Sequence, residues 1–451
     1  MPAEPRTITR LARAIQAGET TSQAATERCL LTIADKNPVL NAFITVLADE
    51  ALAQAKDADR EIAGGRVRGP LHGVPISLKD LMDLQGTATT GASRVREGHI
   101  ASADAPAVAN LRQAGAVFVG KCNLHEFAFG TTNEDSAFGP AHHPVDPSRS
   151  PGGSSGGSAV SVATGMAFAS IGTDTGGSIR IPAAACGVVG LKPGYGEVST
   201  AGVVPLSRTM DHVGPLCTSV EDAGIVYDAL RGAPPVALQP RDIRGLRFGV
   251  PREYFLTLLD SQVAFSFESA CERLRGAGAD VDDVQIPHAS DIAPIYLHIV
   301  LAEAAAYHAK TLETRPDGYT ANVRLRLEMG RYILAEDYVR ALTGREVLRA
   351  DVNAALAGRD ALLLPAVAIP ATKIGVNSVK VGTSEEAVRN ITLRLTQPFN
   401  LSGHPAISLP CGRTTDGLPI GLQLVGASAR THELLEIAAA VERYLSPGAS
   451  R

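Results

Sequence analysis

The sequence concentrates glycine and serine in two short clusters that lie close together in the chain. The first is GGSSGG, residues 152–157, and the second is DTGGS, residues 174–178. Residues 158–165 between them are small and typical of a tightly packed helix, and the apolar run 166–171 is short enough for a buried strand. A flexible linker would not hold an apolar strand between its glycines. We therefore expect two loops held against each other, each able to bring backbone N–H groups close to a ligand.

A lysine in an apolar setting precedes the two clusters. Residues 73–80, GVPISLKD, are typical of a short buried strand, and Lys79 follows Ile76 and Leu78 instead of lying on a polar face. A lysine at a strand end can extend its ammonium group to water, so the pattern leaves two interpretations open. In the second one, burial disfavours the charged form and lowers the lysine pKa by roughly 3–5 units, which creates a base near neutral pH.

A serine in a glycine turn, combined with such a lysine, suits acyl transfer. Serine can be activated by any base within hydrogen-bond reach, and serine–lysine pairs are one known arrangement. Ser178 follows Gly176 and Gly177, so backbone N–H groups without side chains lie beside its own hydroxyl. Donors of this kind stabilise a tetrahedral oxyanion, and loss of one typically costs about 2.7–4 kcal/mol of activation free energy.

Other glycine motifs explain the first cluster less well. No Gly-Lys-Ser/Thr follows it, as a P-loop requires, and the proline-rich residues 147–151 stand where a dinucleotide fold would have a strand. The cluster matches G-x-S-x-G with either Ser154 or Ser155 in the centre, but the missing strand also argues against an α/β-hydrolase. The eleven histidines give no metal-ligand spacing, so we predict no metal and no cofactor.

Composition restricts the class of protein further. The chain has 451 residues, of which 45% are hydrophobic and 20% charged, enough for a substantial core. A net charge of −5 without a basic stripe argues against nucleic acid as a partner. Six scattered cysteines indicate reduced thiols and a cytoplasmic protein. The first 30 residues lack the pattern of a signal peptide, and the absence of a run of about 18 apolar residues argues against a membrane span.

Helical and strand-like segments alternate along the chain, which predicts an α/β fold with a largely parallel or mixed sheet covered on both faces. The predicted helices are 7–17, 21–34, 49–62, 103–115, 219–230, 262–276, 385–396 and 431–444, and 292–357 is mostly helical. The predicted strands are 41–47, 73–80, 116–120, 166–171, 186–191, 246–250, 279–284, 361–364, 406–409 and 420–425. The alternation of helices and strands continues past the proline-rich residues 233–242, so we expect one domain over residues 1–451.

Three segments together resemble the amidase signature family. They are GVPISLKD, the long stretch SPGGSSGGSAVSVATGMAFASIGTDTGGSIRIPAAACGVVGLKP, and the later DGLPIGLQLVG. The resemblance covers roughly residues 5–445 and is strongest over 70–222. Two glycine–serine loops that follow a lysine in this order are far more specific than a single glycine motif. The resemblance implies one α/β/α domain around a large twisted mixed sheet, and hydrolysis of carbon–nitrogen bonds other than peptide bonds.

The resemblance also implies roles for individual residues. Ser178 would be the nucleophile, Ser154 a bridging serine that follows a cis peptide, and Lys79 the base. The proton would pass from Ser178 through Ser154 to Lys79 and return to the leaving nitrogen, and water would then hydrolyse the acyl-enzyme. The backbone of Thr175, Gly176, Gly177 and Ser178 would form the oxyanion hole. The supporting residues would be Ser155, Asp174 and Arg180, and the acyl side of the pocket would contain Ala128, Phe129, Gly130 and Thr131.

Two other functions stay open. One branch of the family, comprising the A subunits of glutamyl-tRNA amidotransferases, releases ammonia from glutamine with partner subunits. The chain keeps DGLPIGLQLVG with Asp416, as that branch does, but HHPVD lacks its usual tryptophan and LLLPAVAIPATKIG differs from its Pro-Thr-Thr-Pro pattern. The other alternative is a silent binding protein on the same fold, which the three filled triad positions disfavour.

We therefore favour a free-standing amidase, a monomer or homodimer without nucleic-acid or membrane partners. It would act on a small apolar or aromatic amide or on a carbamate (as a urethanase) beside Phe127 and Phe129, although two clustered aromatic residues are more often core than substrate wall. The helical region of about 292–357 would lie on the leaving-group side.

Overall fold

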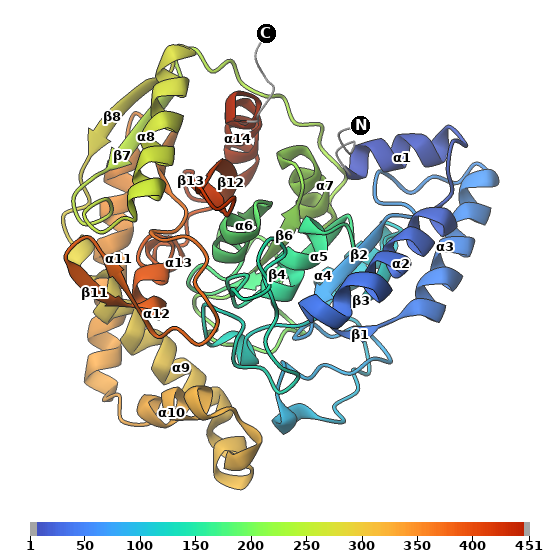
Figure 1. Ribbon diagram of the computed structural model, residues 1–451, viewed down its shortest axis with the longest axis horizontal. Coiled ribbons are helices and arrows are strands. Elements are labelled where there is room, and N and C mark those ends of the chain that lie inside the picture. Colours follow the sequence, from blue (N-terminus) through green and yellow to red (C-terminus); the bar gives the residue numbers. More distant parts are fainter. Residues whose placement is uncertain (1–6, 446–451) are drawn as a thin grey trace.

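A mixed sheet of eleven strands runs through the protein. The computed structural model describes residues 7–445 (Figure 1). Side by side, the strands are β1 (Phe43–Val46), β3 (Val117–Cys122), β2 (Pro75–Lys79), β4 (Ala169–Asp174), β6 (His212–Cys217), β5 (Val189–Lys192), β12 (Ala406–Arg413), β13 (Pro419–Val425), β9 (Ala361–Pro365), β7 (Arg247–Pro251) and β8 (Asp280–Val284). β2 pairs in parallel with β3 and β4, and β7 with β8 and β9, whereas the other pairs are antiparallel. The predicted mixed sheet is confirmed.

Helices flank this sheet. The first group is α1 (Ile8–Gln16), α2 (Ser22–Leu40), α3 (Ala48–Ala63), α4 (Pro106–Gln113), α5 (Gly156–Ala163), α6 (Arg180–Cys186), α7 (Val220–Leu230), α8 (Ser261–Gly276) and α14 (Thr431–Leu445). The second group is α9 (Ile292–Thr314), α10 (Ala321–Gly330), α11 (Ala335–Leu356), α12 (Val388–Leu393) and α13 (Pro398–Leu401). α7, α8 and α14 pack in one layer, and α5 and α6 pack against each other and the central strands. Figure 1 shows α9, α10 and α11 grouped beside the sheet at the lower left.

Local sequence signals explain how several of these helices begin. The Thr7 hydroxyl accepts a hydrogen bond from Arg10 N at the start of α1, and the Thr21 hydroxyl accepts one from Ala24 N at the start of α2. Such caps satisfy N–H groups that have no partner within the helix. Threonine is one of the residue types that the first position before a helix favours, so the sequence itself accounts for both starts.

Two predicted elements are wrong. The segment 186–191 is not one strand, because α6 ends at Cys186 and β5 begins only at Val189. Pro182 lies in the first turn of α6, where its missing N–H is not needed, and three alanines follow. The segment 385–396 is not one helix, because it starts in a two-stranded hairpin of β10 (Ser378–Val381) and β11 (Ser384–Ala387).

Other elements were missed or misplaced. β6 was not predicted, and its internal Pro215 is a residue that strands usually avoid. α2 extends to Leu40 and includes Pro38, beyond the predicted end at residue 34. β4 starts three residues later than the apolar run, because Met166 and Ala167 belong to the turn after α5.

The helical region predicted over 292–357 consists of α9, α10 and α11, with a short turn at Pro316–Gly318. Among residues 7–445, one helical segment, Ala289–Thr314, is long and apolar enough to cross a membrane by length and composition alone. It packs against α10 and α11, and 44% of its apolar stretch is buried in the protein. These contacts within the fold account for part of the apolar surface of α9.

Candidate active site

The carboxyl ends of two neighbouring strands bring the predicted base next to a glycine–serine loop. β2 and β4 are parallel, with Leu78 opposite Ile171, so both strands end at the same edge of the sheet. β2 ends at Lys79 and β4 ends at Asp174. Every residue of both strands is buried, which explains why the sequence of each strand is nearly continuous in apolar or small residues.

The Lys79 side chain is completely buried and contacts two hydroxyl groups. Its Nζ atom donates to Ser154 Oγ at 2.7 Å and to Thr173 Oγ1 at 2.8 Å. Burial lowers the pKa of Lys79 from 10.5 to about 7, although the negative charges of Asp174 and Asp211 oppose this change. The direct partners are neutral, so the cost of desolvating the ammonium prevails. Lys79 can therefore be a neutral amine near pH 7.

The two serines of the first cluster make different contacts. The Gly153–Ser154 peptide is cis, and a Cβ atom on Gly153 would lie 2.8 Å from Asn133 N, so only glycine fits there. Whereas Ser154 contacts Lys79, the Ser155 hydroxyl donates to Thr173 O at 3.2 Å, and α5 begins at the next residue. Ser155 thus joins the start of α5 to β4.

The second cluster lies directly against the first. Ser178 follows β4 and precedes α6, and its side chain is almost fully enclosed. The N–H group of Ser155 donates to the Ser178 carbonyl at 3.2 Å, which joins the two loops. This contact confirms the prediction that the two loops are held against each other. It places the backbone of Ser178 next to Ser155, the neighbour of Ser154 in the chain.

The two glycines before Ser178 have no room for a side chain. Gly177 has a φ of +141°, and a Cβ atom on it would collide with Thr396 Oγ1. A Cβ atom on Gly176 would collide with Tyr296 Oη. Thr396 Oγ1 also donates to Gly176 O at 2.6 Å. The loop backbone is therefore fixed by α9 and by the segment after α12, and this fixed geometry is what a site that stabilises an oxyanion requires.

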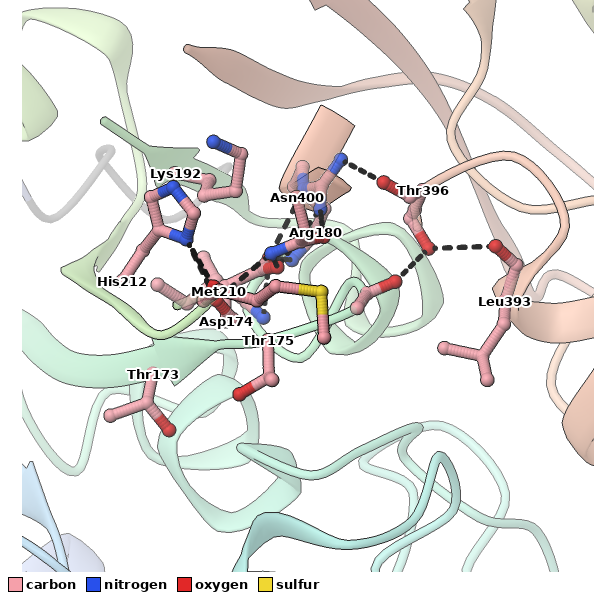
Figure 2. A network of polar contacts seen from close by, with 12 residues as sticks. Thr173, Asp174, Thr175, Arg180, Lys192, Met210, His212, Leu393, Thr396 and Asn400 are labelled. Carbon is pink, nitrogen blue, oxygen red and sulfur yellow. Dashed lines mark hydrogen bonds and ion pairs between the residues drawn. The ribbon is translucent and has the colours of Figure 1, made fainter. Parts of the chain in front are cut away.

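A buried ion pair holds the same loop from behind (Figure 2). Arg180 donates from Nε to Asp174 Oδ2 at 3.0 Å and from Nη2 to Asp174 Oδ1 at 2.9 Å. Its remaining bonds go to Gln423 Oε1, Thr396 O and Asn400 Oδ1. Burial alone would raise the pKa of Asp174, but the Arg180 guanidinium reverses this and holds that pKa well below its usual value. Both charges are thus paired and hydrogen-bonded, as burial demands.

The predicted acyl-side segment lies beside the first loop. Ala128 has a positive φ of 59°, Phe129 is fully buried, and Phe129 O accepts a hydrogen bond from Arg326 Nη1 at 2.6 Å. A side chain on Gly130 would collide with the His125 ring, and the backbone N–H of the same histidine donates to Ser154 O at 3.0 Å. Residues 128–130 therefore reach the Ser154 loop through His125.

The remaining members of this segment face different surroundings. Thr131 lines a small cavity together with Gly152 and Thr392. Phe127 packs on His308 and Tyr319, with ring centroids 4.4 Å and 5.6 Å apart. Phe127 is 1% exposed and is therefore part of the core between α9 and the strands.

Several side chains at this site come from segments that the sequence analysis did not single out. Thr175 Oγ1 donates to Asp211 Oδ1 at 2.5 Å, and burial raises the pKa of Asp211 to about 6. Thr173, the second partner of Lys79, could have been found, because it lies directly before Asp174, the first residue of the second glycine–serine cluster. Tyr296 and Asn400 carry no local motif, since each reaches the loop only through tertiary packing.

No group of three or more histidine, cysteine, aspartate or glutamate side chains suited to hold a metal occurs within residues 7–445. All six cysteines are buried thiols. Burial raises the pKa of Cys122, which lies close to this site, to about 11. Its thiol is therefore a poor nucleophile at neutral pH.

The fold and the site define a class of protein. The family model described as Amidase matches residues 24–435, so the chain belongs to the amidase family. The solved structures that share its fold include amidase signature enzymes. It is an enzyme of that family that acts on carbon–nitrogen bonds other than peptide bonds, as a hydrolase or as an amidotransferase.

Particular members of the family resemble the chain over its whole length. The A subunit of the glutamyl-tRNA(Gln) amidotransferase of Roseiflexus sp. (strain RS-1) is 38% identical, and the match covers 97% of this chain and 96% of that protein. A crystal structure described as an amidase is 38% identical, with a TM-score of 0.93 over 98% of this chain and 100% of that one. The A subunit of the glutamyl-tRNA(Gln) amidotransferase of Thermotoga maritima is 34% identical, with a TM-score of 0.77 over 94% and 91%.

Proposed function

We propose that the protein hydrolyses small amides through an acyl-enzyme on Ser178, with Ser154 and Lys79 as the proton relay. One observation carries the proposal: a lysine that is completely buried, whose partners are hydroxyl groups and whose pKa is lowered to about 7, donates to Ser154 at 2.7 Å. A structural lysine would normally keep its charge by pairing with a carboxylate. A base that is neutral near pH 7 has the property that general-base catalysis requires.

The proposed reaction follows from this relay. As Ser178 Oγ attacks the amide carbonyl, its proton passes to Ser154 and the proton of Ser154 passes to Lys79. The negative charge on the carbonyl oxygen faces the backbone N–H groups of residues 175–178, the proposed oxyanion hole. The proton then returns to the leaving nitrogen, the carbon–nitrogen bond breaks, and water releases the acyl group by the same route. Ser155, Asp174 and Arg180 act by holding the loops.

The dependence of activity on pH tests the assignment of the base. Lys79 must be neutral before attack, and its pKa is about 7. We expect kcat/KM to rise about tenfold per pH unit below pH 7 and to level off above it, since each unit below the pKa reduces the neutral fraction tenfold. The measurement is kcat/KM between pH 5 and 9.5 with an uncharged amide. A profile already flat at pH 5, as a carboxylate base would give, contradicts the assignment.

We propose further that the chain acts by itself, in the cytoplasm, as a monomer or homodimer. At similar sequence identity, its backbone matches the amidase structure with a TM-score of 0.93 and the Thermotoga maritima amidotransferase protein with 0.77. The net charge of −5 gives no electrostatic attraction for tRNA. The second candidate is the A subunit of a glutamyl-tRNA(Gln) amidotransferase, because relatives with that name match at up to 38% identity.

A substrate screen with the purified chain separates these two functions. We expect the chain alone to hydrolyse aliphatic amides, anilides or aryl carbamates, and to turn over glutamine at most slowly. The measurement is release of ammonia or amine, with Ser178→Ala protein as the control for background hydrolysis. If glutamine is the sole substrate turned over, and turnover requires the companion proteins and charged tRNA, the protein is the amidotransferase subunit instead. No turnover of any ester, amide or carbamate would support a silent binding protein.

A further inference from the structure

A cavity of about 220 Å³ adjoins the loop that carries Ser178. Side chains from α9 and α12 line it, among them Tyr296, Arg389 and Leu393. A Cβ atom on Gly176 would clash with Tyr296 Oη and would be in tight contact with Leu393 Cδ2. The wall of the cavity is therefore in contact with the proposed oxyanion hole. In Figure 1, α12 lies beside α9.

Arg389 is the unusual residue in this wall. Its Nε atom is enclosed, yet it finds no hydrogen-bond acceptor among the residues that the structure describes, and no ion pair is formed by its guanidinium there. Burial lowers the pKa of Arg389, and the hydroxyl of Tyr296 offsets this only in part. Arg389 is only partly buried, so the unsatisfied group is its enclosed Nε donor, and such a donor is expensive to maintain. A guanidinium without a protein partner on the wall of a cavity indicates that the missing partner is a ligand.

The neighbouring arginines are already occupied. Arg326 donates to Phe129 O at 2.6 Å and lies over the Phe129 ring, 5.9 Å from its centroid. Arg394 donates to Tyr254 O from Nε at 3.1 Å, and its guanidinium lies 3.7 Å from the centroid of the Tyr254 ring. Each of these two arginines therefore has a protein acceptor for at least one of its donors. Arg389 therefore differs from both of them.

The nearby carboxylates do not neutralise Arg389. Glu386 lines the same cavity, but the charge that it stabilises is that of Arg394. Asp135 contacts His125 at 3.1 Å and Asn322 at 3.2 Å. Burial is the main cause that lowers the pKa of Arg326, and the positive charge of Arg389 lowers it further. The two guanidinium groups therefore repel each other. Two arginines, Arg389 and Arg394, thus line the cavity against one carboxylate, Glu386.

We propose that Arg389 binds an anionic group of the substrate, so that the enzyme selects small amides that bear a carboxylate a few bonds from the scissile carbonyl and, unlike glutamine, no ammonium group beside it. A guanidinium and a carboxylate form two parallel hydrogen bonds, which fix the orientation of the substrate as well as its charge. This inference rests on the amide hydrolysis proposed above and names its substrate class. It replaces the expectation of an apolar or aromatic substrate, because Phe127 and Phe129 are both enclosed in the core.

A matched pair of substrates tests the proposal. Succinamate and butyramide have the same length and the same amide, and only succinamate carries a carboxylate. We expect the enzyme to prefer succinamate by at least about tenfold in kcat/KM, and Arg389→Met to lower kcat/KM for succinamate by about a hundredfold or more. For butyramide the same variant should change kcat/KM by less than about threefold. Glutaramate and valeramide extend the comparison by one methylene.

Two further variants test whether the preference for succinamate depends on the paired hydrogen bonds of Arg389 or on positive charge in general. Arg389→Lys keeps the charge but loses the paired hydrogen bonds, so it should recover only part of the preference for succinamate. Arg340→Gln on α11 removes an exposed positive charge, whose side chain is 73% accessible, and should leave the preference unchanged. An equal loss of activity on both substrates in Arg389→Met, or no preference for succinamate in the unaltered enzyme, would overturn the proposal.

Binding separates this inference from the proposed function. Calorimetry with succinate on Ser178→Ala protein, and on the Ser178→Ala, Arg389→Met double variant, measures anion recognition without turnover. Binding that requires Arg389, in a protein that hydrolyses no amide, would reject the function and keep the anion site. Hydrolysis of neutral amides together with succinate binding that does not depend on Arg389 would keep the function and reject the anion site.

Discussion

Replacement of Ser178 by alanine is expected to abolish acyl-enzyme formation and to lower kcat/KM by roughly 10⁵–10⁶-fold. The substitution removes the only group in the proposed mechanism that forms a bond to the substrate. Ser178 is nearly enclosed and its loop is fixed by Thr396, Tyr296 and the Asp174–Arg180 pair, so no other hydroxyl can take its place without movement of that loop. The measurements are steady-state hydrolysis and labelling with a fluorophosphonate, followed by peptide mapping of the labelled residue.

Ser155→Ala is the matched control for this experiment. Ser155 is a buried serine 23 positions earlier, whose hydroxyl donates to Thr173 O rather than to Lys79. We expect that variant to be labelled still at Ser178 and to lose at most about tenfold in activity, since a hydrogen bond to the backbone contributes on the order of 1 kcal/mol. Label on Ser155 in the unaltered protein, or full activity in Ser178→Ala, would reject Ser178 as the nucleophile.

The sequence predicted best those parts of the site that lie on consecutive residues. The apolar run around Ile76 and Leu78 indicated the buried strand that ends at Lys79, and β2 has that position. The glycine clusters indicated two loops in contact, and the bond from Ser155 N to Ser178 O joins them. In each case the signal is local, because alternation, small residues and chain order are enough to produce the element.

Residues that reach the site from distant segments could not be predicted in this way. Arg389 and Tyr296 follow Ser178 by more than a hundred residues and lie on helices whose local patterns carry no sign of a ligand. Arg389 stands in a segment predicted as one long helix, whereas a hairpin and the short α12 place it on the cavity wall. Its lack of a partner is a property of tertiary packing and has no counterpart in spacing or composition.

The same limit explains why the substrate was predicted differently. Phe127 and Phe129 are the conspicuous aromatic residues near the proposed acyl side, and an aromatic or apolar substrate followed from them. In the folded chain Phe127 packs on His308 and Tyr319, and Arg326 covers Phe129. Their hydrophobic surface is buried in the core, which supports the proposal that polar groups of the neighbouring cavity decide the specificity.

Replacement of Lys79 by methionine or by arginine is expected to lower kcat/KM by about 10³–10⁴-fold each, because general-base assistance contributes up to this amount. Arginine is the sharper test. It keeps a positive charge and hydrogen-bond donors, but its pKa stays too high for it to accept a proton. Activity in Lys79→Arg close to that of the unaltered enzyme would show that the lysine serves only as a charged donor. The rise of activity through pH 7 should vanish in both variants.

Stability separates a catalytic lysine from a structural one. The pKa of Lys79 falls from 10.5 to about 7 on folding, so between these values the unfolded chain binds more protons, and the lysine destabilises the fold. This penalty is nearly complete at pH 7, on the order of 5 kcal/mol, and it disappears as pH rises toward 10.5. Lys79→Met removes the penalty and leaves the hydroxyls of Ser154 and Thr173 without this partner, at about 1–3 kcal/mol each.

The net expectation for Lys79→Met at pH 7 is therefore a free energy of unfolding between about 1 kcal/mol below and about 3 kcal/mol above that of the unaltered protein, together with the loss of activity. Thermal unfolding of both proteins at pH 7 and at pH 9.5 measures the difference in the free energy of unfolding. This difference should become less favourable to Lys79→Met at the higher pH. A variant that is both inactive and destabilised by several kcal/mol at pH 7 would indicate that Lys79 supports the fold. A buried amine that costs stability and yet is needed for turnover is explained only by the reaction that it serves.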